Sequence, residues 1–411
     1  MSEYPVELNH TGAKTLMWAN EAEIEPSALQ QLKDVSELPG LHGLRVMPDV
    51  HWGNGATVGS VIAMEQALAP AAVGVDIGCG VNAVRTSLKL EDFDDKDLHV
   101  LRGKFENIVP VGFNGHENLS QILTYLGTLG AEAVRFLDTV DTLRADLTEK
   151  RNTDAAVRGR TANQLGTLGG GNHFIELTTD STDTVWITLH SGSRNIGKSL
   201  AERHIKIAKA DPRNEDLPKH LKDLSLFFKG TPEMDDYLHD LRWAQRFAML
   251  SRSVMMALIK RSLSEHFLER GKTVFFDNEI NCHHNYVAEE MIDGKMMIVT
   301  RKGAISAKRG ELALIPGSMA TGSYIVRGLG NDASFQSASH GAGRRMSRTA
   351  AKKTYTVEDL ERTMVGIEAR TDEGVLDEIS LAYKDLDSVI AAESDLVEVV
   401  QKLNTILCVK G

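Results

Sequence analysis

A glycine-rich turn carries one carboxylate and one thiol that could bind a metal ion together. It reads Gly-Val-Asp-Ile-Gly-Cys-Gly over residues 74–80. Because glycine permits tight backbone turns, the side chains of Asp76 and Cys79 can be directed to one point. Carboxylate and thiolate groups are both metal ligands. The alternative is a structural turn with a buried cysteine, since free cysteine packs as a small apolar side chain.

Histidines far apart in the chain extend this candidate metal site. His173 follows a run of glycines, His190 follows a short apolar segment, and His284 lies in a polar stretch at 279–286. A single histidine usually has an ordinary polar role, but five candidate ligands in similar contexts indicate a shared site.

The donor types of these five residues restrict the metal and its number. One thiolate, one carboxylate and three imidazoles suit Zn²⁺, Mn²⁺, Fe²⁺ or Co²⁺ better than Ca²⁺ or Mg²⁺. Five ligands exceed the three of a catalytic zinc. We therefore expect two metal ions bridged by the Cys79 thiolate, an arrangement typical of phosphoryl transfer.

Donors for phosphate groups are also present. Hydroxyl and guanidinium groups that suit a phosphate-rich ligand are found at Ser191, Ser193, Arg194, Ser318 and Arg344. The P-loop pattern GxxxxGK[ST] is missing, which argues against that class of nucleotide site. His340 stands in the polar stretch 337–344, and by chemistry alone it could be a sixth ligand, a general base or a covalent nucleophile.

Short strands joined by glycine turns must position these residues. Apolar segments predict strands at 57–63, 185–189 and 296–300, and 47–55 reads as a turn. Helical spacing is present at 26–38, 90–147, 357–369 and 386–392, and 150–163 reads as a loop. The segment 198–270 is mainly helical. Thr231 is its best helix start, with Pro232 in the first turn.

These elements predict an α+β fold in which a β-rich core carries the site. The helical segment at about 198–270 reads as an insertion into that core. Site residues extend from the first strands to residue 343, so we expect one main domain over 1–411 rather than two independent ones.

Composition narrows the cellular setting. The chain has 411 residues, three cysteines and a formal net charge of −11. The sparse cysteines favour a reducing compartment, and no secretory signal or long apolar run is found, so we expect a cytoplasmic protein. The negative charge argues against nonspecific coating of nucleic acid, although residues 333–357 contain five basic and no acidic residues. That tract is either a local basic groove or a solvated face.

Taken together, the motifs resemble the RtcB family of RNA-splicing and repair ligases. The resemblance extends over nearly the whole chain, through 47–55, 74–80, 165–176, 189–194, 279–286, 316–318, 339–348, 382–385 and 409–411. It implies an RtcB-like fold and a GTP- and Mn²⁺-dependent enzyme. Such an enzyme joins an RNA 3′-phosphate, or a 2′,3′-cyclic phosphate that it first opens, to a 5′-hydroxyl. GMP passes from a guanylylated histidine to the RNA 3′-phosphate and is then displaced.

The resemblance also implies roles for individual residues. His340 becomes the guanylylated nucleophile, and the metal ligands become Asp76, Cys79, His173, His190 and His284, holding two Mn²⁺. The nucleotide-binding residues become Asn172, Phe174, Glu176, Ser318, Ser323, Gly341, Ala342, Gly343, Tyr383 and Lys410, of which Glu176 reads guanine. The RNA-binding residues become Arg194, Lys302, Arg344 and Arg348.

Some segments depart from the family pattern. Residues 51–55 read His-Trp-Gly-Asn-Gly, whereas His-Leu-Gly-Lys-Gly is expected. Arg345 replaces an apolar residue, and 104–163 matches poorly. These differences concern RNA contacts more than the core chemistry, and they suggest repair of particular cleaved RNAs, such as tRNA or rRNA, rather than splicing.

The expected partner is therefore RNA, with an archease-like protein as a candidate activator, and neither DNA nor a membrane is expected.

Two alternative functions use parts of the same pattern of residues. A bimetallic phosphoesterase that hydrolyses RNA cyclic phosphates needs the five ligands but neither His340 nor Glu176. A non-catalytic RNA-binding or chaperone protein needs no intact site.

Overall fold

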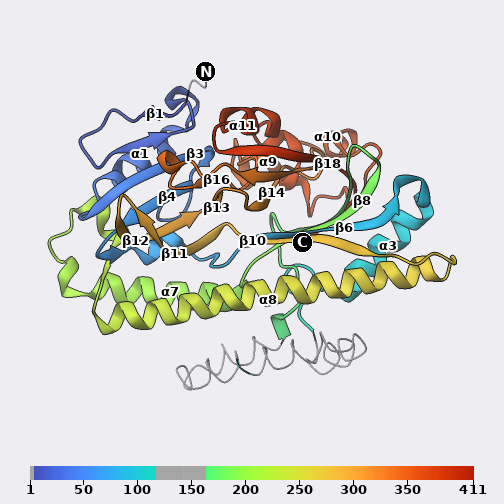
Figure 1. Ribbon diagram of the computed structural model, residues 1–411, viewed down its shortest axis with the longest axis horizontal. Helices are drawn as coiled ribbons and strands as arrows, with labels where there is room; N and C mark the ends of the chain where they lie inside the picture. Colours follow the sequence, from blue (N-terminus) through green and yellow to red (C-terminus); the bar gives the residue numbers. More distant parts are fainter. Residues whose placement is uncertain (1–3, 117–141, 143–162) are drawn as a thin grey trace.

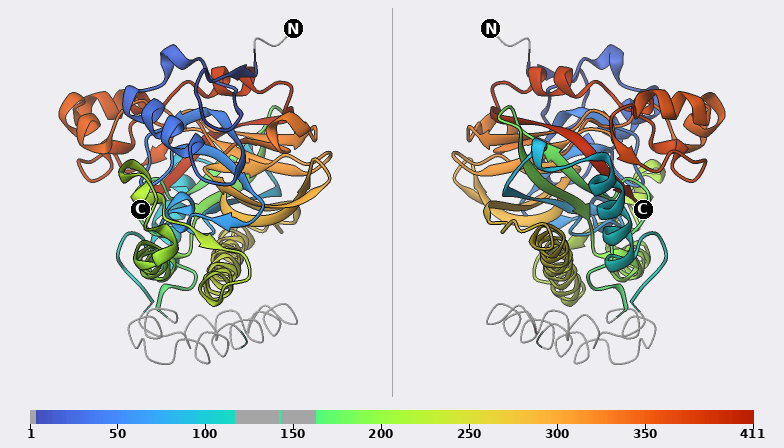
Figure 2. Two further views of the ribbon diagram at one scale, coloured as in Figure 1. Left: turned by 90° about the vertical axis from the view of Figure 1, so that its left-hand side faces the viewer. Right: turned by 90° about the vertical axis from the view of Figure 1, so that its right-hand side faces the viewer.

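The computed structural model describes residues 4–116, 142 and 163–411 of the chain. Two large β-sheets form the centre, and two long helices lie side by side beneath them (Figure 1, Figure 2). The predicted α+β fold with a β-rich core is confirmed.

The first sheet has six strands in the order β1-β2-β3-β4-β12-β11. The strands are β1 (Val6–Glu7), β2 (Thr15–Met17), β3 (Leu41–His51), β4 (Val58–Met64), β11 (Asn285–Ile292) and β12 (Lys295–Lys302). Neighbours pair antiparallel except β2 and β3. The register pairs His51 with Val58, and Lys302 with Ser60 and Asn285. One edge of this sheet therefore carries His51, Lys302 and the residue after His284.

The second sheet runs in the order β10-β6-β8-β7-β18-β15-β14, with β17 beside β18. Its strands are β6 (Gly80–Lys89), β7 (Phe174–Thr179), β8 (Thr184–Ser191), β10 (Phe276–His283), β14 (Leu312–Pro316), β15 (Ser323–Gly328), β17 (Glu368–Ala369) and β18 (Val397–Lys410). Its outermost strands β10 and β14 contact each other, so the antiparallel sheet nearly closes into a barrel.

The register of the second sheet brings the candidate ligands to one edge. Gly80 pairs with both Ser191 and His283, and Phe174 pairs with both His190 and Lys410. Each of these residues lies at or beside the end of its strand. Residues directly opposite in antiparallel strands have Cβ atoms about 5 Å apart, so the strand pairing itself gathers segments more than 300 residues apart in sequence.

Two small sheets complete the strands. They are β5 (Ala67–Leu68) with β9 (Phe227–Phe228), and β13 (Ala304–Ser306) with β16 (Ser337–Ser339). Because Ala304 pairs with Ser339, the second pair holds His340 beside the end of β12.

The helices surround the sheets. They include α1 (Pro26–Ser36), α2 (Pro70–Val73), α3 (Asp95–Ile108), α7 (Arg194–Ala210), α8 (Pro232–Leu268), α9 (Arg348–Thr354), α10 (Val357–Thr363) and α11 (Leu386–Ala392). The predicted start of α8 is confirmed, since the Thr231 side chain accepts a hydrogen bond from the Met234 backbone N–H.

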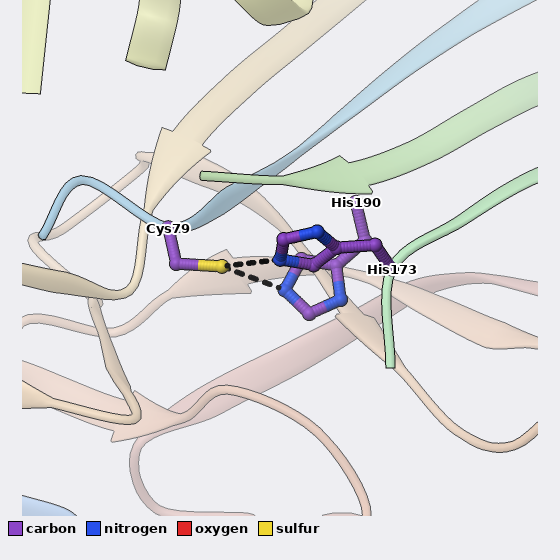
Figure 3. Close-up of side chains that lie close together, drawn as sticks. All are labelled: Cys79, His173 and His190. Atoms are coloured by element: carbon purple, nitrogen blue, oxygen red, sulfur yellow. Dashed lines mark hydrogen bonds between the residues drawn. The ribbon is translucent and has the colours of Figure 1, made fainter. Parts of the chain in front are cut away.

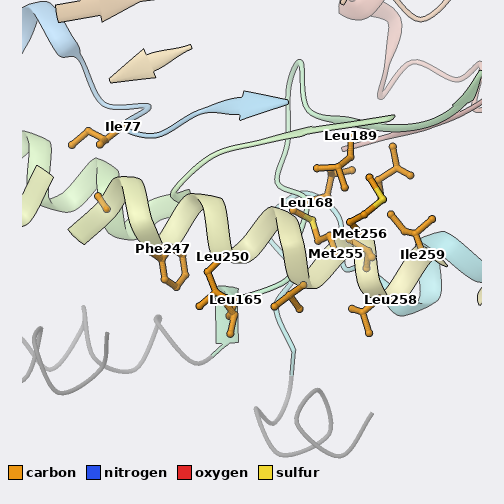
Figure 4. Close-up of a cluster of buried hydrophobic side chains, with 14 of the residues drawn as sticks. Ile77, Leu165, Leu168, Leu189, Phe247, Leu250, Met255, Met256, Leu258 and Ile259 are labelled. Carbon is orange, nitrogen blue, oxygen red and sulfur yellow. The ribbon is translucent and has the colours of Figure 1, made fainter. Parts of the chain in front are cut away.

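The long helix α8 is part of the core. Its apolar side chains, among them Leu250 and Met255, pack with Leu168 and Leu189 of the site-bearing segments (Figure 4). The mainly helical segment begins at Arg194, slightly before the predicted start at about 198, and the short strand β9 interrupts it. Its packing against the second sheet places it directly under the candidate site.

Three local predictions need comment. The turn predicted at 47–55 is wrong over its first half, because β3 continues to His51. The register shifts between Val46 and His51, and this irregularity accommodates Pro48 within a strand. The helix predicted at 357–369 ends at Thr363, shortly before Gly366, whose φ of +81° terminates helical structure. The helix predicted over 90–147 is observed as α3, but α3 ends at Ile108 and residues 109–116 are not helical, so the prediction is wrong there. Pro110 disfavours helical backbone at the residue before it. Most of the remaining predicted helix, like most of the loop predicted at 150–163, lies outside the described residues.

Among the helices of the described residues, none has the length and apolar character that crossing a membrane requires.

Candidate functional site

The two sheet edges meet at a cavity of about 760 Å³. Most of the residues predicted for the site line it. These are Asp76, Cys79, Asn172, His173, Phe174, His190, Arg194, His284, Lys302, His340, Gly341, Ala342, Gly343, Arg344, Arg348, Tyr383 and Lys410. One cavity thus contains residues from β3, β7, β8, β12 and β18 and from the loops beside the strands.

Cys79 lies at the centre of a sulfur–nitrogen cluster. Its Sγ is 3.2 Å from Nε2 of His190 and 3.5 Å from Nε2 of His173 (Figure 3). Cys79 comes from the glycine turn before β6, His173 from the loop before β7, and His190 from the end of β8. Each residue offers one ligand atom, and these three atoms lie within 4.8 Å of one another.

Hydrogen bonds to the backbone fix which ring nitrogens face the thiol. Nδ1 of His173 is 2.9 Å from the carbonyl of Leu168, and Nδ1 of His190 is 3.2 Å from that of Asn172. Because a carbonyl only accepts, each Nδ1 carries the proton and each Nε2 presents a lone pair. Two lone pairs then face one thiol, which has a single proton to donate.

This donor set fits a metal ion. Two imidazole nitrogens and one sulfur converge, and each imidazole is oriented by a backbone carbonyl, which is the usual outer support of a metal-binding histidine. Within the described part of the chain, this is the group of histidine, cysteine and acidic residues whose geometry could hold an ion.

His284 extends the cluster, and Asp76 lies at its border. Nε2 of His284 is 3.1 Å from Nε2 of His190, and its backbone N–H donates to the carbonyl of Cys79. Asp76 is exposed to the same cavity, and its carboxylate makes no hydrogen bond to the cluster within the described residues. The structure therefore brings four of the five predicted ligands into a chain of contacts and places the fifth beside them.

Burial sets the protonation of these groups. It lowers the pKa of His173 to about 3, with Arg194 adding to the effect, and it lowers the pKa values of His190 and His284 well below the ordinary value. The imidazoles are therefore neutral, which is the form that binds metals. Burial also raises the pKa of the Cys79 thiol to about 12, and the nearby Asp76 carboxylate raises it further. A bound cation reverses this effect, because metal coordination deprotonates a thiol.

His340 is held by a buried carboxylate. Oδ2 of Asp49 is 2.5 Å from Nδ1 of His340 and accepts a hydrogen bond from its backbone N–H at 3.1 Å. The ring centre of His340 lies 4.8 Å from that of His284. Asp49 thus fixes the proton on Nδ1 and leaves Nε2 unprotonated, beside the sulfur–nitrogen cluster.

A second buried carboxylate holds the residue before His340. Glu393, at the end of α11, accepts hydrogen bonds from the backbone N–H of Ser339 at 2.9 Å and from its hydroxyl at 2.6 Å. Both residues are fully buried. Burial raises the pKa of Glu393 to about 8, against the opposing effect of the bonds from Ser339. The helix α11 is thereby connected to the strand that presents His340.

Two predicted RNA-binding cations lie on the cavity wall. Arg194 begins α7 with a left-handed φ of +59°, and its guanidinium donates to Thr167 Oγ1 and to the Gly112 carbonyl. Lys302 is buried and donates to the carbonyl of Asn54. Burial lowers the pKa of Lys302 to about 8, although the Asp76 carboxylate opposes this shift.

The other predicted nucleotide- and RNA-binding groups gather around Glu378. Its carboxylate accepts from Tyr383 Oη at 2.6 Å and pairs with Lys410 Nζ at 3.0 Å. Arg344 and Arg348 pair with the same carboxylate. Burial alone would raise the pKa of Glu378, but Lys410, Arg348 and the Tyr383 hydroxyl hold it at about 2. A single ionised carboxylate therefore positions four residues predicted for substrate binding.

Three predicted nucleotide-binding residues do not line the cavity. Ser318 bonds to Thr321 at 3.0 Å, and Ser323 is buried at the start of β15. Glu176 is buried opposite Cys408 in the pairing of β7 and β18. Burial raises the pKa of Glu176 to about 7, although Lys410 and hydrogen bonds with Cys408 and Thr405 oppose the shift. Glu176 lies two residues beyond Phe174, on the same face of β7, so it is near the cavity but behind its wall.

The sequence did not indicate Arg252, a fully buried residue of α8. Its guanidinium donates to the Gly78 carbonyl at 2.8 Å, to the Ser191 carbonyl at 3.1 Å and to Asn281 at 2.9 Å. Those three residues belong to the segments that carry Cys79, His190 and His284. A charged residue within the apolar stripe of α8 was the available signal.

The roles of Asp49, Glu378 and Glu393 were also not predicted. Asp49 stands in the segment 47–55, but nothing in its spacing connects it to His340, almost 300 positions later. Glu378 and Glu393 lie in acidic stretches typical of solvated surface.

The cavity and its cluster belong to an enzyme, an RNA ligase, as comparison with known proteins shows. Residues 31–411 match the family model described as tRNA-splicing ligase RtcB. The chain therefore belongs to the RtcB family, which confirms the resemblance found in its motifs.

Individual relatives agree with this assignment along nearly their whole length. The chain is 45% identical to the RNA-splicing ligase RtcB of Escherichia coli K12, with 98% of this chain and 99% of that protein covered. It is 29% identical to the tRNA-splicing ligase RtcB of Nanoarchaeum equitans, with 94% and 92% covered. For the tRNA-splicing ligase RtcB of Thermococcus kodakarensis the identity is 28%, with 93% and 91% covered.

Proposed function

We propose that this RNA ligase uses GTP to join an RNA 3′-phosphate, or a 2′,3′-cyclic phosphate after hydrolytic opening, to a 5′-hydroxyl. The observation that carries the proposal is the pair formed by His340 and Asp49. Asp49 directs the unprotonated Nε2 of His340 into a cation-lined cavity beside a metal-type cluster. An imidazole presented in this way is suited to nucleophilic attack on phosphorus.

The reaction then has three transfers. Nε2 of His340 forms a bond to the α-phosphorus of GTP, and the bond to the β-phosphate oxygen breaks to release pyrophosphate. An oxygen of the RNA 3′-phosphate takes the GMP, which breaks the P–N bond and creates a diphosphate linkage. The RNA 5′-hydroxyl attacks the 3′-phosphorus, loses its proton and displaces GMP. Asp49 stabilises the positive charge on the ring during the first transfer.

The residues that would hold two Mn²⁺ are Asp76, Cys79, His173, His190 and His284. Their fit rests on neutral imidazoles: the Nε2 atoms of His173 and His190 face the Cys79 sulfur, and Nε2 of His284 faces that of His190. Bound metal supplies positive charge that stabilises the phosphates as their charge changes. Sulfur and nitrogen donors also suit Zn²⁺, so the choice of Mn²⁺ as the metal bound in the cell is itself part of the proposal.

Guanine selection would come from Glu176 and Phe174. A carboxylate can accept from N1–H and N2–H of guanine, and adenine has no matching donors. Glu176 lies behind the cavity wall, so this role requires the β7–β18 end to open when the nucleotide binds. Tyr383, Lys410, Ser318, Ser323 and the backbone of 341–343 complete the proposed nucleotide site.

RNA phosphates would meet the cavity cations Arg194, Lys302, Arg344 and Arg348. The expected setting is the cytoplasm, with cleaved tRNA or other RNA as substrate and an archease-like protein as a candidate activator. The departures at 51–55 and 104–163 favour repair of particular RNAs.

The test is covalent labelling. The full chain is incubated with Mn²⁺ and GTP labelled at the α-phosphate, and we expect GMP to become attached to His340. Labelling should disappear in His340→Ala and persist in His99→Ala, an exposed histidine of α3 outside the cavity. Labelling that survives His340→Ala contradicts the proposal. Metal-dependent hydrolysis of an RNA cyclic phosphate without any labelling favours the bimetallic phosphoesterase instead.

A further inference from the structure

Trp52 is an exposed aromatic residue on the wall of the cavity. The chain has four tryptophans. Trp18, Trp186 and Trp243 are buried, whereas Trp52 is 49% exposed and lines the cavity with His51, Asn54 and Asp76. Exposing an indole is unfavourable unless a ligand covers it, and the leucine expected here in the family has no aromatic face.

The loop that carries Trp52 is fixed on both sides. Before it, Nδ1 of His51 bonds to the Asp49 carbonyl at 2.9 Å. After it, Gln31 of α1 accepts from the Gly53 N–H at 3.2 Å and donates to the Gly53 carbonyl at 2.6 Å. Lys302 donates to the next carbonyl, that of Asn54. The indole is therefore exposed on a rigid backbone, which lowers the entropy lost when a ligand stacks on it.

The charged side chains around Trp52 indicate which class of ligand would bind there. Six cations line the cavity within the described residues, and Asp76 is the one carboxylate among its lining side chains. The six are Arg194, Lys198, Lys302, Arg344, Arg348 and Lys410. An aromatic face beside such cations is the combination that binds single-stranded nucleic acid, because cations contact the backbone while bases stack on the ring.

We propose that Trp52 is a stacking platform for an unpaired base at the end of the RNA substrate. This inference rests on the proposed function, since it concerns the RNA that enters the same cavity. It assigns the chain a preference for RNA ends whose last base is free to leave a helix. A paired terminal base must first be unpaired and unstacked to leave its helix, which costs a few kcal/mol.

Removing the stack has a predictable size. Base–aromatic stacking is typically worth a factor of roughly 5 to 150 in affinity. Trp52→Leu should therefore weaken binding of RNA with an unpaired end by about that factor. It should have little effect on RNA whose terminal nucleotide has no base.

Tryptophan fluorescence tests this directly, because three of the four indoles are buried. Unlabelled single-stranded RNAs bearing a 3′-phosphate or a 5′-hydroxyl are titrated into the full chain with Mn²⁺ and without GTP, so that no ligation occurs. Each RNA is compared with a version whose terminal nucleotide is abasic. Filter binding of the same RNAs measures how much RNA is bound.

We expect RNA with a terminal base to quench the fluorescence and the abasic version not to quench it, at equal occupancy. Comparing the two RNAs identifies which end stacks. Trp52→Leu should abolish the quenching. Phe275→Leu, which removes an exposed aromatic ring outside the cavity, should leave it intact.

Equal quenching by the abasic RNA, quenching that persists in Trp52→Leu, or bound RNA without quenching would each overturn the proposal, as would a failure to bind RNA. GMP labelling of the wild-type chain is measured separately. If labelling occurs but the quenching pattern is absent, the stacking inference fails while the proposed ligase chemistry stands. If labelling is absent, the proposed function fails whatever the fluorescence shows.

Discussion

Cys79 is the residue on which the contacts of the metal-type cluster converge. Its Sγ faces the Nε2 atoms of both His173 and His190, and its carbonyl accepts from the backbone of His284. Burial makes an unbound thiolate unfavourable here. The cluster therefore has few ways to satisfy its lone pairs other than by binding a cation.

Cys79→Ser tests that role. Serine keeps the size of the side chain but offers a hydroxyl, which is a poorer metal ligand than a thiolate. We expect bound metal per chain to fall and GMP labelling of His340 to become undetectable, while the thermal unfolding temperature changes little. Elemental analysis and the labelling assay measure both. Cys282→Ser is the matched control, and wild-type metal content in Cys79→Ser would contradict the assignment.

Asp49→Asn tests the orientation of the nucleophile. The amide keeps the shape but removes the charge that, in the proposed reaction, would stabilise the ring of His340 while it carries GMP. We expect the labelling rate at saturating GTP to fall by roughly 10²- to 10⁴-fold, with a much smaller change in KM. Asp293→Asn, at an exposed carboxylate that contacts His42, is the control. A fall confined to KM would show that Asp49 acts in binding instead.

At the residue scale, the sequence identified the residues that gather in the cavity better than it identified the residues that hold them in place. Cys79 and the histidines were identifiable because their types are rare and each stands next to glycines or a strand end. Asp49 and Arg252 were not, because hydrogen bonds between remote segments leave no spacing signal. Glu176 was placed by resemblance, and its burial behind the cavity wall depends on the pairing of β7 with β18, which local sequence does not reveal.

One side chain of the helix α8 contacts three of the site-bearing segments at once. Arg252 reaches from α8 to the carbonyls of Gly78 and Ser191 and to Asn281. A helix that looked like an insertion therefore supports the ends of β6, β8 and β10. Stability and metal binding should consequently respond together to changes at this position.

Arg252→Met removes the donors and keeps most of the length. Each carbonyl left without a donor should cost about 1–3 kcal/mol of unfolding free energy, although Gly78 retains the bond from His283. Denaturant titration measures the loss, and metal affinity should fall in the same samples. Arg242→Met, at an exposed position of the same helix, controls for removal of a charge. Lower stability with unchanged metal affinity would show that Arg252 supports the fold but does not support metal binding.

Glu393 gives the junction of α11 and β16 a pH dependence. Burial raises its folded-state pKa from an ordinary 4.5 to about 8, so the folded chain holds a proton that the unfolded chain releases. Stability should therefore fall as pH rises from about 4.5 to about 8, and this contribution should level off above that. Glu393→Gln, which cannot ionise, should remove the slope. The urea concentration at the midpoint of unfolding is measured for the wild type and Glu393→Gln between pH 5 and 8.5. The same pH dependence in both proteins would contradict the prediction.

At the element scale, prediction succeeded where a local pattern was sufficient. The helix α11 and the start of α8 follow from spacing and capping. The strand β3 was misread because Pro48 and the following glycines resemble a turn, whereas tertiary pairing with β2 and β4 extends the strand through an irregular register. The end of α10 depends on Gly366, but the helical spacing of apolar residues predicted a helix that continues past this glycine.

The whole molecule combines an acidic surface with a cationic cavity. The net charge is −11, yet within the described residues Asp76 is the one acid among the side chains lining the cavity. Five of the six cations are bonded to internal partners. Arg344, Arg348 and Lys410 pair with Glu378, Lys302 donates to the Asn54 carbonyl, and Arg194 donates to Thr167 and the Gly112 carbonyl. Repulsion from the outer surface and attraction inside it should together restrict RNA binding to ends that can enter.

The salt dependence of RNA binding measures how many phosphates the cavity contacts. If about three or four phosphates meet cations such as Arg194, Lys198, Lys302 and Arg348, then log affinity should fall with log salt at a slope of about −2 to −3, because single strands lose about 0.7 per contact. Removing one contact in Lys198→Ala should reduce the slope by about 0.7. Filter binding of a 3′-phosphate RNA from 50 to 300 mM salt provides the slopes. A slope near zero would mean that the cations serve the fold alone, and a slope steeper than about −5 would place RNA along the outer surface.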